Sequence, residues 1–594
     1  MNEIGAKIGG LFLGVVLLVP VMGIASPRKK PEVAALPTQP DPPAVIHLEE
    51  QIAQQEAENI RNLQKYSPRV ETYLQEFQAS NTTGYAPTSD SYYLGRLVCN
   101  GTAGSVSFLS EDRSTTQPKV RSIVGHMNPF HSPTPFFINS FAADALIDAR
   151  GIDRDQYAYS FVRSEFLGEI RCLVFDIQPK DTEHDRFKGR IWVEDKDYNI
   201  VRFNGIYLNP PRGYRYFHCD SWRENLLPGQ WLPVYIYSEE EGLHVGHVGD
   251  REKDSRDMSF RSQTRFWGYD LSGASRNDEL TEILVEAKDP VKDDSEAASS
   301  IGSPLASQRQ WETESEQNVL DRLEKARLLA PPSEMDKVLE VVVNNLIVTN
   351  HYENLPPVHC RVLLTLPFES FTLGHTIILS RGLIDVLPDE ASLAMMLSHE
   401  LAHIVLGHLP DTRYGFHDRL ISNDEDLLKS LDFSHSPEEE KAADAKGLDL
   451  LKNSPYNSSL GSAGMFLRAM TADYPHTPNL FGAHLGDRLG ADSGQLLVRM
   501  ATLMNSAGQY QPAKLDQIAA LPLGSRVVVN ARNGEVSMTK NKAPAPLSPR
   551  EKMPFQITPL YPYLRRLTAP ASASLTVVPA NPPVEKADNG AEAK

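Results

Sequence analysis

Hydrophobic positions along this chain follow two spacings, and the change between them separates regions of different structure. In residues 46–78, leucines and isoleucines recur among many Gln and Glu residues, which predicts a helix. From about residue 92 to 285, short apolar runs alternate with polar turns, which predicts an antiparallel, strongly curved sheet. The clearest runs are residues 161–163, 172–175, 189–193, 200–203 and 232–237.

Helical spacing returns from about residue 313 to 515. Two valine-containing runs, Val527–Val529 and Val536–Met538, then flank Asn533-Gly534, which predicts a late β-hairpin. The expected fold class is therefore multidomain, with an antiparallel curved β-sheet domain followed by a mainly α domain.

Composition marks the boundaries between these regions. Residues 27–45 are rich in Pro and Ala, and residues 286–312 are acidic and Ser-rich, so both are expected to be linkers. Residues 541–594 are again Pro/Ala-rich, which predicts a disordered tail. The expected domains are 46–285, a helix plus a β-rich accessory domain, 313–515, the helical domain, and 516–540, the C-terminal hairpin.

The first residues have the pattern of an export signal. Lys7 precedes an apolar run over residues 8–24, and small residues at Gly23 and Ala25 fit cleavage after Ala25. Residues 1–25 are thus expected to be a signal peptide or, alternatively, an uncleaved anchor, although the basic residues 28–30 disfavour export. We expect an exported, periplasmic or otherwise extracytoplasmic protein, with membrane contact only through such an anchor.

Charge and cysteine content exclude several classes of protein. The chain has 594 residues, too many for one core, and a formal net charge of −18, which argues against nucleic-acid binding. Its cysteines are Cys99, Cys172, Cys219 and Cys360, and none forms a CxxC pair, so a disulfide-dense scaffold and a thiolate metal site are not expected. Export would permit disulfides, but the sequence leaves their pairing open.

The most specific chemical signal is His399-Glu400-Leu-Ala-His403. Residues four apart lie on one helix face, so both imidazoles can bind one zinc ion while Glu400 reaches a water beside it. Asp389 is a candidate N-cap, and Gly407 favours the end of this helix. A chance motif on a core helix is the alternative, but burying these polar side chains without a partner would be costly.

A third ligand is expected downstream. Leu406 and Leu409 stand where a metzincin needs glycine and histidine, which excludes that class, and His408 is off register, so we expect it beside the site or at the surface. Residues 436–439 form a capping box with proline, and Glu440 and Asp444 follow one turn apart.

Small residues at Ala443 and Gly447 would let this second helix approach the first. We therefore expect Glu440 to bind the ion and Asp444 to accept a hydrogen bond from a ligand histidine. The alternative is an ordinary acidic first turn, which the helix dipole favours.

These two motifs, with the upstream stretch Phe371-Thr-Leu-Gly374 to Ile384, resemble the HtpX and CAAX-prenyl-protease family of zinc metallopeptidases over about residues 330–490. The resemblance implies a zincin-type α+β metallopeptidase domain, a gluzincin with one zinc per chain. Glu369 stands where the family usually has asparagine, and His484 and Arg488 are loosely similar to its histidine-to-arginine motif.

The implied activity is hydrolysis of peptide bonds in protein or peptide substrates. Glu400 would accept a proton from water and pass it to the leaving amine. Residues 376–380 are expected to be an edge strand that pairs with an extended substrate. Candidates for stabilising the oxyanion are His484, Arg488, Tyr474 and His476, and each has the alternative of being a surface polar residue.

A second resemblance concerns the β-rich half. The hairpin pattern from Phe187 to Phe203 is similar to one in LolA-like lipoprotein-carrier domains, which implies a curved sheet around an apolar cavity; the alternative is a β-domain without a ligand. Three functions are left open, two of them from the resemblances and the third because the His399–His403 motif specifies the water chemistry better than the substrate. They are a zinc endopeptidase acting on unfolded envelope proteins, an exported lipid or client carrier or chaperone whose metallopeptidase half is not primarily proteolytic, and a zinc hydrolase of a non-peptide substrate.

Overall fold

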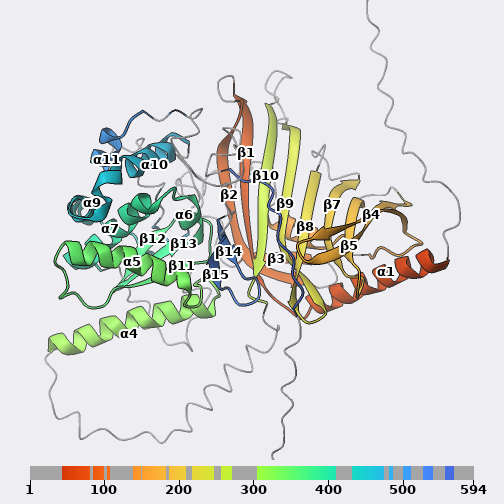
Figure 1. Ribbon diagram of the computed structural model, residues 1–594, viewed down its shortest axis with the longest axis horizontal. Coiled ribbons are helices and arrows are strands. Elements are labelled where there is room, and N and C mark those ends of the chain that lie inside the picture. Colours follow the sequence, from red (N-terminus) through yellow and green to blue (C-terminus); the bar gives the residue numbers. More distant parts are fainter. Residues whose placement is uncertain are drawn as a thin grey trace, which may run out of the picture. The chain divides into compact units, whose positions relative to one another are not determined.

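The computed structural model describes residues 43–80, 84–99, 103–107, 138–148, 150–181, 186–208, 217–245, 256–269, 304–409, 431–473, 480–483, 485, 500–509, 511, 526–539 and 556–567 (Figure 1). The expected signal peptide and most of the first linker therefore lie outside the described residues. Among the helices of the described part, none has the length and apolar character needed to cross a membrane.

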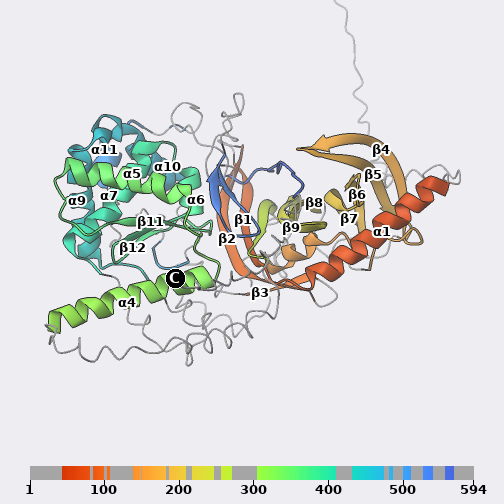
Figure 2. The ribbon, with the colours of Figure 1, turned by 60° about the horizontal axis from the view of Figure 1, so that its bottom comes forward.

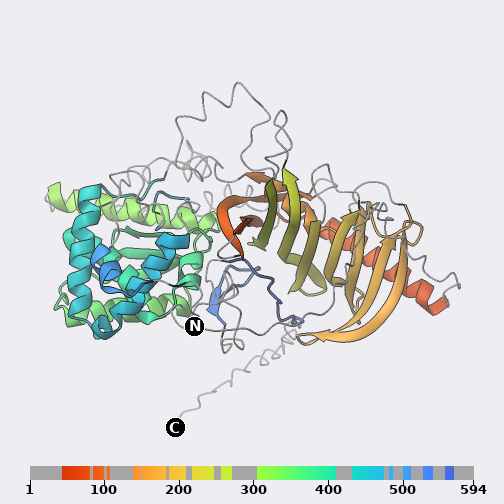
Figure 3. The ribbon, with the colours of Figure 1, turned by 90° about the horizontal axis from the view of Figure 1, so that it is seen from above.

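Ten antiparallel strands form one large sheet, in the order β3-β2-β1-β10-β9-β8-β7-β6-β5-β4. The register shifts within several strand pairs, for example between Glu76 and Phe77 and between Trp192 and Val193, and such bulges increase twist and bend a sheet. Figure 3 shows the resulting curvature, which confirms the expected antiparallel curved sheet. The strands are β1 (Arg69–Ser80), β2 (Gly84–Cys99), β3 (Ala103–Ser107), β4 (Tyr157–Leu167), β5 (Ile170–Pro179), β6 (Arg186–Glu194), β7 (Ile200–Leu208), β8 (Phe217–Leu227), β9 (Gln230–Val245) and β10 (Arg256–Trp267).

Helix α1 (Pro43–Leu63) packs on one face of this sheet, where Ile52 joins a core with Phe175, Phe187 and Phe203. The helix expected over residues 46–78 is wrong beyond residue 63, because residues 69–80 form β1. This strand pairs with β10 and β2 inside the sheet, so Glu71, Gln75 and Glu76 are buried instead of lining a solvated helix face.

The helical half has an α+β arrangement around a three-stranded sheet (Figure 2). Its elements are α4 (Pro304–Lys325), α5 (Glu334–Thr349), β11 (His359–Leu363), β12 (Ser370–Leu373), β13 (Thr376–Ser380), α6 (Arg381–Val386), α7 (Glu390–Leu406), α9 (Pro437–Lys452), η5 (Pro455–Ser459), α10 (Leu460–Asp473) and α11 (Ala501–Ser506). The start of α4 at Pro304 lies inside the segment expected to be a linker, 286–312.

The strand order β11-β13-β12 corrects the expected edge strand. Residues 376–380 are the central strand, paired in parallel with β11 and antiparallel with β12, so both of their edges are occupied. The outer strand next to the histidine helix is β12, because Thr372 donates a hydrogen bond to the Glu400 carbonyl oxygen at 3.2 Å.

Two later segments pack on the main body of the protein. Strands β14 (Val527–Val529) and β15 (Val536–Met538) form an antiparallel hairpin, and the backbone N–H of Val527 donates to Asp385. The expected disordered tail over 541–594 is wrong for residues 556–567, because Ile557 and Leu564 are fully buried. Buried side chains of the large sheet and of the helical half belong to one core cluster.

Three cysteines, Cys172, Cys219 and Cys360, are buried and free. The described residues therefore give no support to a disulfide among these three positions.

Candidate metal centre

Helix α7 carries the histidine motif and is positioned by caps at both of its ends. The Asp389 side chain accepts a hydrogen bond from the backbone N–H of Ser392 at 2.8 Å. Gly407, with φ 72°, ends the helix in the left-handed conformation that glycine adopts without steric cost. Between these caps the helix is buried from Ala391 to His403 apart from Leu393, so its polar side chains are held in a core.

His399, Glu440 and His403 converge in that core. The Nε2 atoms of the two histidines are 3.1 Å apart, and a Glu440 carboxylate oxygen lies 3.2 Å from Nε2 of His399. One ligand atom from each of the three buried residues lies within 4.8 Å of the others. The residues expected from sequence to share one ion are thus side by side.

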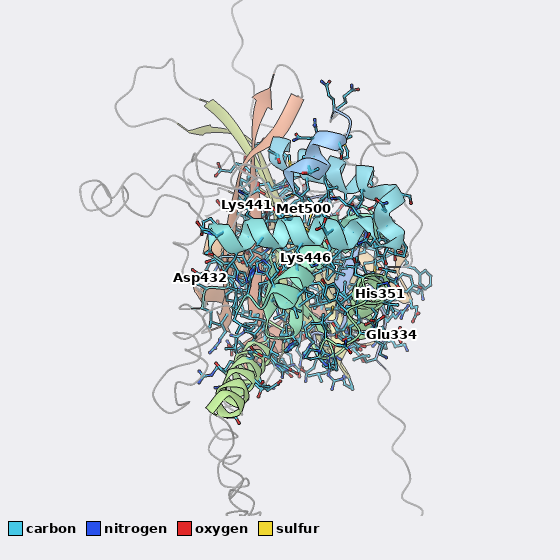
Figure 4. The ribbon with its side chains drawn as sticks, turned by 90° about the vertical axis from the view of Figure 1, so that its left-hand side faces the viewer. Glu334, His351, Asp432, Lys441, Lys446 and Met500 are labelled. Atoms are coloured by element: carbon cyan, nitrogen blue, oxygen red, sulfur yellow. The ribbon has the colours of Figure 1, made fainter. Side chains whose placement is uncertain are left out.

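Helix α9 carries Glu440 and packs on α7, so that Glu440 lies 3.2 Å from His399. In Figure 4, Lys441 and Lys446 mark α9, and Met500 lies beside it. Its start is a capping box, in which the Ser436 hydroxyl accepts from the Glu439 N–H and the Glu439 carboxylate accepts from the Ser436 N–H. Close approach depends on Gly447, where an added Cβ would lie 3.1 Å from the Ser398 carbonyl oxygen and 3.3 Å from Cα of His399.

Asp444 lies behind the first histidine. Its carboxylate is 2.8 Å from Nδ1 of His399 and also accepts the backbone N–H of Met500 at 3.0 Å. A carboxylate this close to Nδ1 favours the tautomer with its proton on Nδ1, which would leave the lone pair of Nε2 for an ion. The structure thus places Asp444 where the orienting role requires it.

Glu400 lies one residue after His399 and is 1% exposed. Its carboxylate lies 3.0 Å from the Thr372 hydroxyl, which shares its one proton between this carboxylate and the Glu400 carbonyl oxygen, so β12 fixes the orientation of this group. Sequence reasoning did not identify Thr372, which has no motif of its own and reaches the site only through the sheet.

Two further histidines surround His403. His408 and His403 approach through their Nδ1 atoms at 3.1 Å, and the ring of His435 stacks on His403 at 3.9 Å with an interplanar angle of 21°. Burial lowers the pKa of His435, which favours its neutral form. Sequence reasoning missed His435, although its place directly before the capping box of the ligand helix was an available signal.

Glu369, the departure from the family pattern, has a clear structural partner. Its carboxylate accepts the backbone N–H groups of Leu480 and Phe481 at 2.7 and 2.6 Å. Phe371 stacks on Phe433 at 4.2 Å and also contacts Phe481. The glutamate therefore holds the 480–483 segment against β12. The four oxyanion candidates, His484, Arg488, Tyr474 and His476, lie outside the described residues.

The residues present fit a catalytic zinc ion. Two imidazole nitrogens and one carboxylate oxygen form the ligand set of such sites, which keep one position open. Exposed fractions of 1% for His399, 0% for His403 and 7% for Glu440 mean that their polar atoms are shielded from water, which is costly without a cation between them.

Comparisons with known proteins agree with this geometry. Residues 342–415, from α5 to just beyond α7, match the model of Peptidase family M48, so Glu440 and Asp444 lie downstream of the matched segment. A search of curated proteins returned no match.

Solved structures similar to this chain include a putative outer membrane lipoprotein-sorting protein domain from Vibrio parahaemolyticus, at 10% identity and a TM-score of 0.21, covering 40% of this chain and 99% of that one. A LolA superfamily protein from Nitrosomonas europaea has 14% identity and a TM-score of 0.19, covering 37% and 93%. The MucA/MucB complex of Pseudomonas aeruginosa has 8% identity and a TM-score of 0.13, covering 38% and 96%. The helical half of the chain contains a segment that matches the model of Peptidase family M48, which indicates a protease.

Proposed function

We propose that this protein is a zinc-dependent metalloendopeptidase. The observation that carries the proposal is the convergence of His399, His403 and Glu440 within 4.8 Å, with the carboxylate of Glu400 on the adjacent residue of α7. A zinc ion held there would lower the pKa of a water molecule and polarise the scissile carbonyl.

The remaining steps are assigned to side chains of this chain. Glu400 accepts the proton of the attacking water and passes it to the leaving amine, and Thr372 keeps its carboxylate in place. Asp444 fixes the tautomer of His399 through Nδ1. Extended substrates are expected to lie along the outer edge of β12, the strand that contacts α7, because the edges of β13 are both paired. They would pair beyond Ser370, whose N–H already donates to the Ala483 carbonyl oxygen at 3.3 Å.

The test is Glu400→Gln, assayed on an unfolded protein such as reduced casein together with metal analysis of the purified chain. Loss of the general base should lower cleavage by about 10²–10⁴-fold while one zinc per chain is retained. A chelator should abolish cleavage by the unmodified protein, and added zinc should restore it. Cleavage by Glu400→Gln at the unmodified rate would reject the assignment.

The proposed setting is the periplasm or another extracytoplasmic space, with misfolded envelope proteins as substrates. This rests on the apolar run over residues 8–24, followed by Ala25, and on the resemblance of the helical half. Fractionation of cells that express the full chain, with N-terminal sequencing, tests it: mature protein starting at Ser26 outside the cytoplasm is the expected result.

The curved ten-stranded sheet favours a second candidate, an exported lipid or client carrier or chaperone. If the protein is a carrier or chaperone, Glu400→Gln should still prevent aggregation of an unfolded client in the cell envelope as well as the unmodified chain does. A protein that works through proteolysis would lose most of its effect with this variant.

A further inference from the structure

Residues 556–567 cross the large sheet as an extended segment, blue in Figure 3. The segment contacts β1 through Gln75, whose side-chain oxygen accepts the Ile557 N–H at 2.7 Å, and β9 through Tyr235, whose hydroxyl donates to the Thr558 carbonyl oxygen at 3.4 Å. Farther along, Asn225 of β8 accepts the Leu567 N–H at 2.8 Å. The segment therefore runs across the strands instead of adding to an edge.

This segment occupies the face opposite α1. Successive strand residues point to opposite faces, and Phe203 of β7 packs in the α1 core while its neighbour Arg202 lies on the other side. Arg202 is held by Asp220 through two hydrogen bonds of 2.8 Å, and its guanidinium lies over the rings of Trp192 and Trp222. Tyr561 adds a third ring, with its centroid 5.6 Å from this guanidinium.

A second anchor of the segment is Arg566. Its guanidinium bonds to Glu194, which is fully buried, and to Asp197 at 2.9 Å, and lies 5.9 Å from the centroid of Trp231. Burial acts to raise the pKa of Glu194, but hydrogen bonds from Asn199 and Arg566 lower it below its ordinary value. Glu194, Asp197 and Trp231 thus form an acidic and aromatic pocket for an arginine.

Leu564 lies between the two anchors, Tyr561 and Arg566, and packs closely against the sheet. Its side chain is fully buried, its carbonyl oxygen accepts the N–H of Glu169 at 2.9 Å, and its backbone lies against Gly168. A Cβ on Gly168 would be 2.5 Å from the Leu564 carbonyl oxygen. The turn between β4 and β5 therefore accepts a peptide backbone at this position.

Several features distinguish the segment from a strand of the fold. Pro559 and Pro562 have no N–H to donate, so a regular ladder cannot form. Tyr561 and Tyr563 remain 69% and 62% exposed. Trp222 and Trp231 are buried beside the segment, yet their indole N–H groups have no acceptor among the described residues. The resident segment thus leaves donors on this face unsatisfied, which another peptide could satisfy.

We propose that this face of the sheet is a peptide-binding surface for extended segments with an aliphatic residue two positions before an arginine, and that residues 556–567 are its resident, exchangeable ligand. Held on the same chain, the segment has an effective concentration in the millimolar range, so it competes with clients of the same pattern. The surface is separate from the metal centre and does not depend on the proposed proteolysis.

The test uses the full-length chain and a labelled synthetic peptide with the sequence of residues 556–567. Arg566→Glu places a carboxylate against Glu194 and Asp197, which should release the resident segment and raise the affinity for the peptide about tenfold or more over the unmodified chain. The matched control is Arg565→Glu, because Arg565 is 72% exposed and pairs at 3.6 Å with Glu169, itself 59% exposed. This control should bind the peptide as the unmodified chain does.

A second peptide, with glutamate in place of the arginine that corresponds to Arg566, should bind neither variant. Hydrogen exchange on the unmodified chain gives an independent measurement that needs no folded variant: excess unmodified peptide should speed exchange of the Ile557 and Leu567 amides. If exchange is unchanged at millimolar peptide, or if folded Arg566→Glu binds no peptide, the segment is a fixed part of the fold and the proposal is overturned.

Discussion

The Nδ1 atom of His399 shows how one nearby carboxylate can orient a ligand of the candidate metal centre. Asp444 lies 2.8 Å from it, and the Met500 N–H donates to the same carboxylate, so the position of this group depends on α9 and on the residue preceding α11. A partner of this kind does not contact the ion itself. It restrains the orientation of the side chain that binds the ion.

Replacing Asp444 with alanine should therefore weaken zinc binding about 10- to 100-fold, because His399 loses the group that fixes its tautomer. Competition with a fluorescent chelator measures the affinity directly. Asp449→Ala is the matched control on the same helix, since the Asp449 side chain is 65% exposed and pairs with Lys452. Equal zinc affinities for the two variants would contradict the role of Asp444.

Asp144 makes the folding stability of the protein depend on pH through a buried carboxyl in the β-rich half. Burial raises the pKa of this carboxyl to about 8, although a hydrogen bond from Ser238 opposes the shift. The folded state therefore binds a proton that the unfolded chain, with a pKa near 3.8, has already lost. Since the folded state binds more protons between these values, stability falls as pH rises across this window.

Asp144→Asn removes this titration. The variant should gain stability relative to the unmodified chain as pH rises from about 4 to 8, by up to about 1.4 kcal/mol per pH unit. Urea unfolding at pH 5 and pH 8 measures the difference. A difference between the two proteins that does not change with pH would show that Asp144 is not protonated in the folded state.

At the scale of elements, the packing of α9 on α7 decides whether the three ligands meet. Gly447 lies in the contact, and a Cβ there would also be 3.1 Å from the methyl carbon of Met500. Backbone atoms of Ser398 and His399 cannot move aside as a flexible side chain can, so a larger residue must displace the helix.

Gly447→Val should thus lower zinc affinity and destabilise the fold by about 1–3 kcal/mol through overpacking. Gly461→Ala is the control: in α10, a Cβ at Gly461 meets nothing within 4 Å, and alanine there should be neutral or stabilising by up to about 1 kcal/mol. Thermal unfolding and zinc titration of both variants check this. Full zinc affinity in Gly447→Val would mean that the helix contact does not set the site.

At the scale of the whole molecule, one buried ion pair links the large sheet to the helical half. Arg381 of α6 donates to Glu71 of β1 at 2.5 Å, and the same carboxylate accepts from the Leu366 N–H and the Tyr92 hydroxyl. Both charged residues are almost completely buried, so neither can exchange its partner for water. The two halves therefore share polar as well as apolar contacts.

Glu71→Gln should destabilise the protein by about 3–5 kcal/mol, because Arg381 would keep a buried charge without its partner. The exposed pair Arg190–Asp176 provides the control, and Asp176→Asn should cost less than about 1 kcal/mol. Denaturant unfolding is followed by tryptophan fluorescence, which reports mainly on the large sheet because four of the five tryptophans lie in its strands, and by cleavage activity. Both signals should be lost together. Separate transitions would indicate that the halves unfold independently.

The sequence by itself determined the ligand helix. A spacing of four residues places His399 and His403 on one helix face whatever surrounds them. The capping box before Glu440 is also local, because its hydrogen bonds join residues only three positions apart, Ser436 and Glu439. Alternating short runs likewise predicted the antiparallel sheet, since strand period is a property of neighbouring residues.

Tertiary structure alone decided what depends on residues distant in the chain. The Glu- and Gln-rich stretch became β1 because it pairs on both edges, and β13 became a central strand because two strands flank it. The stacking of His435 on His403 and the burial of Ile557 and Leu564 likewise depend on contacts between distant residues. Local preferences are weak compared with burial and strand pairing, and these come from partners that no sequence window contains.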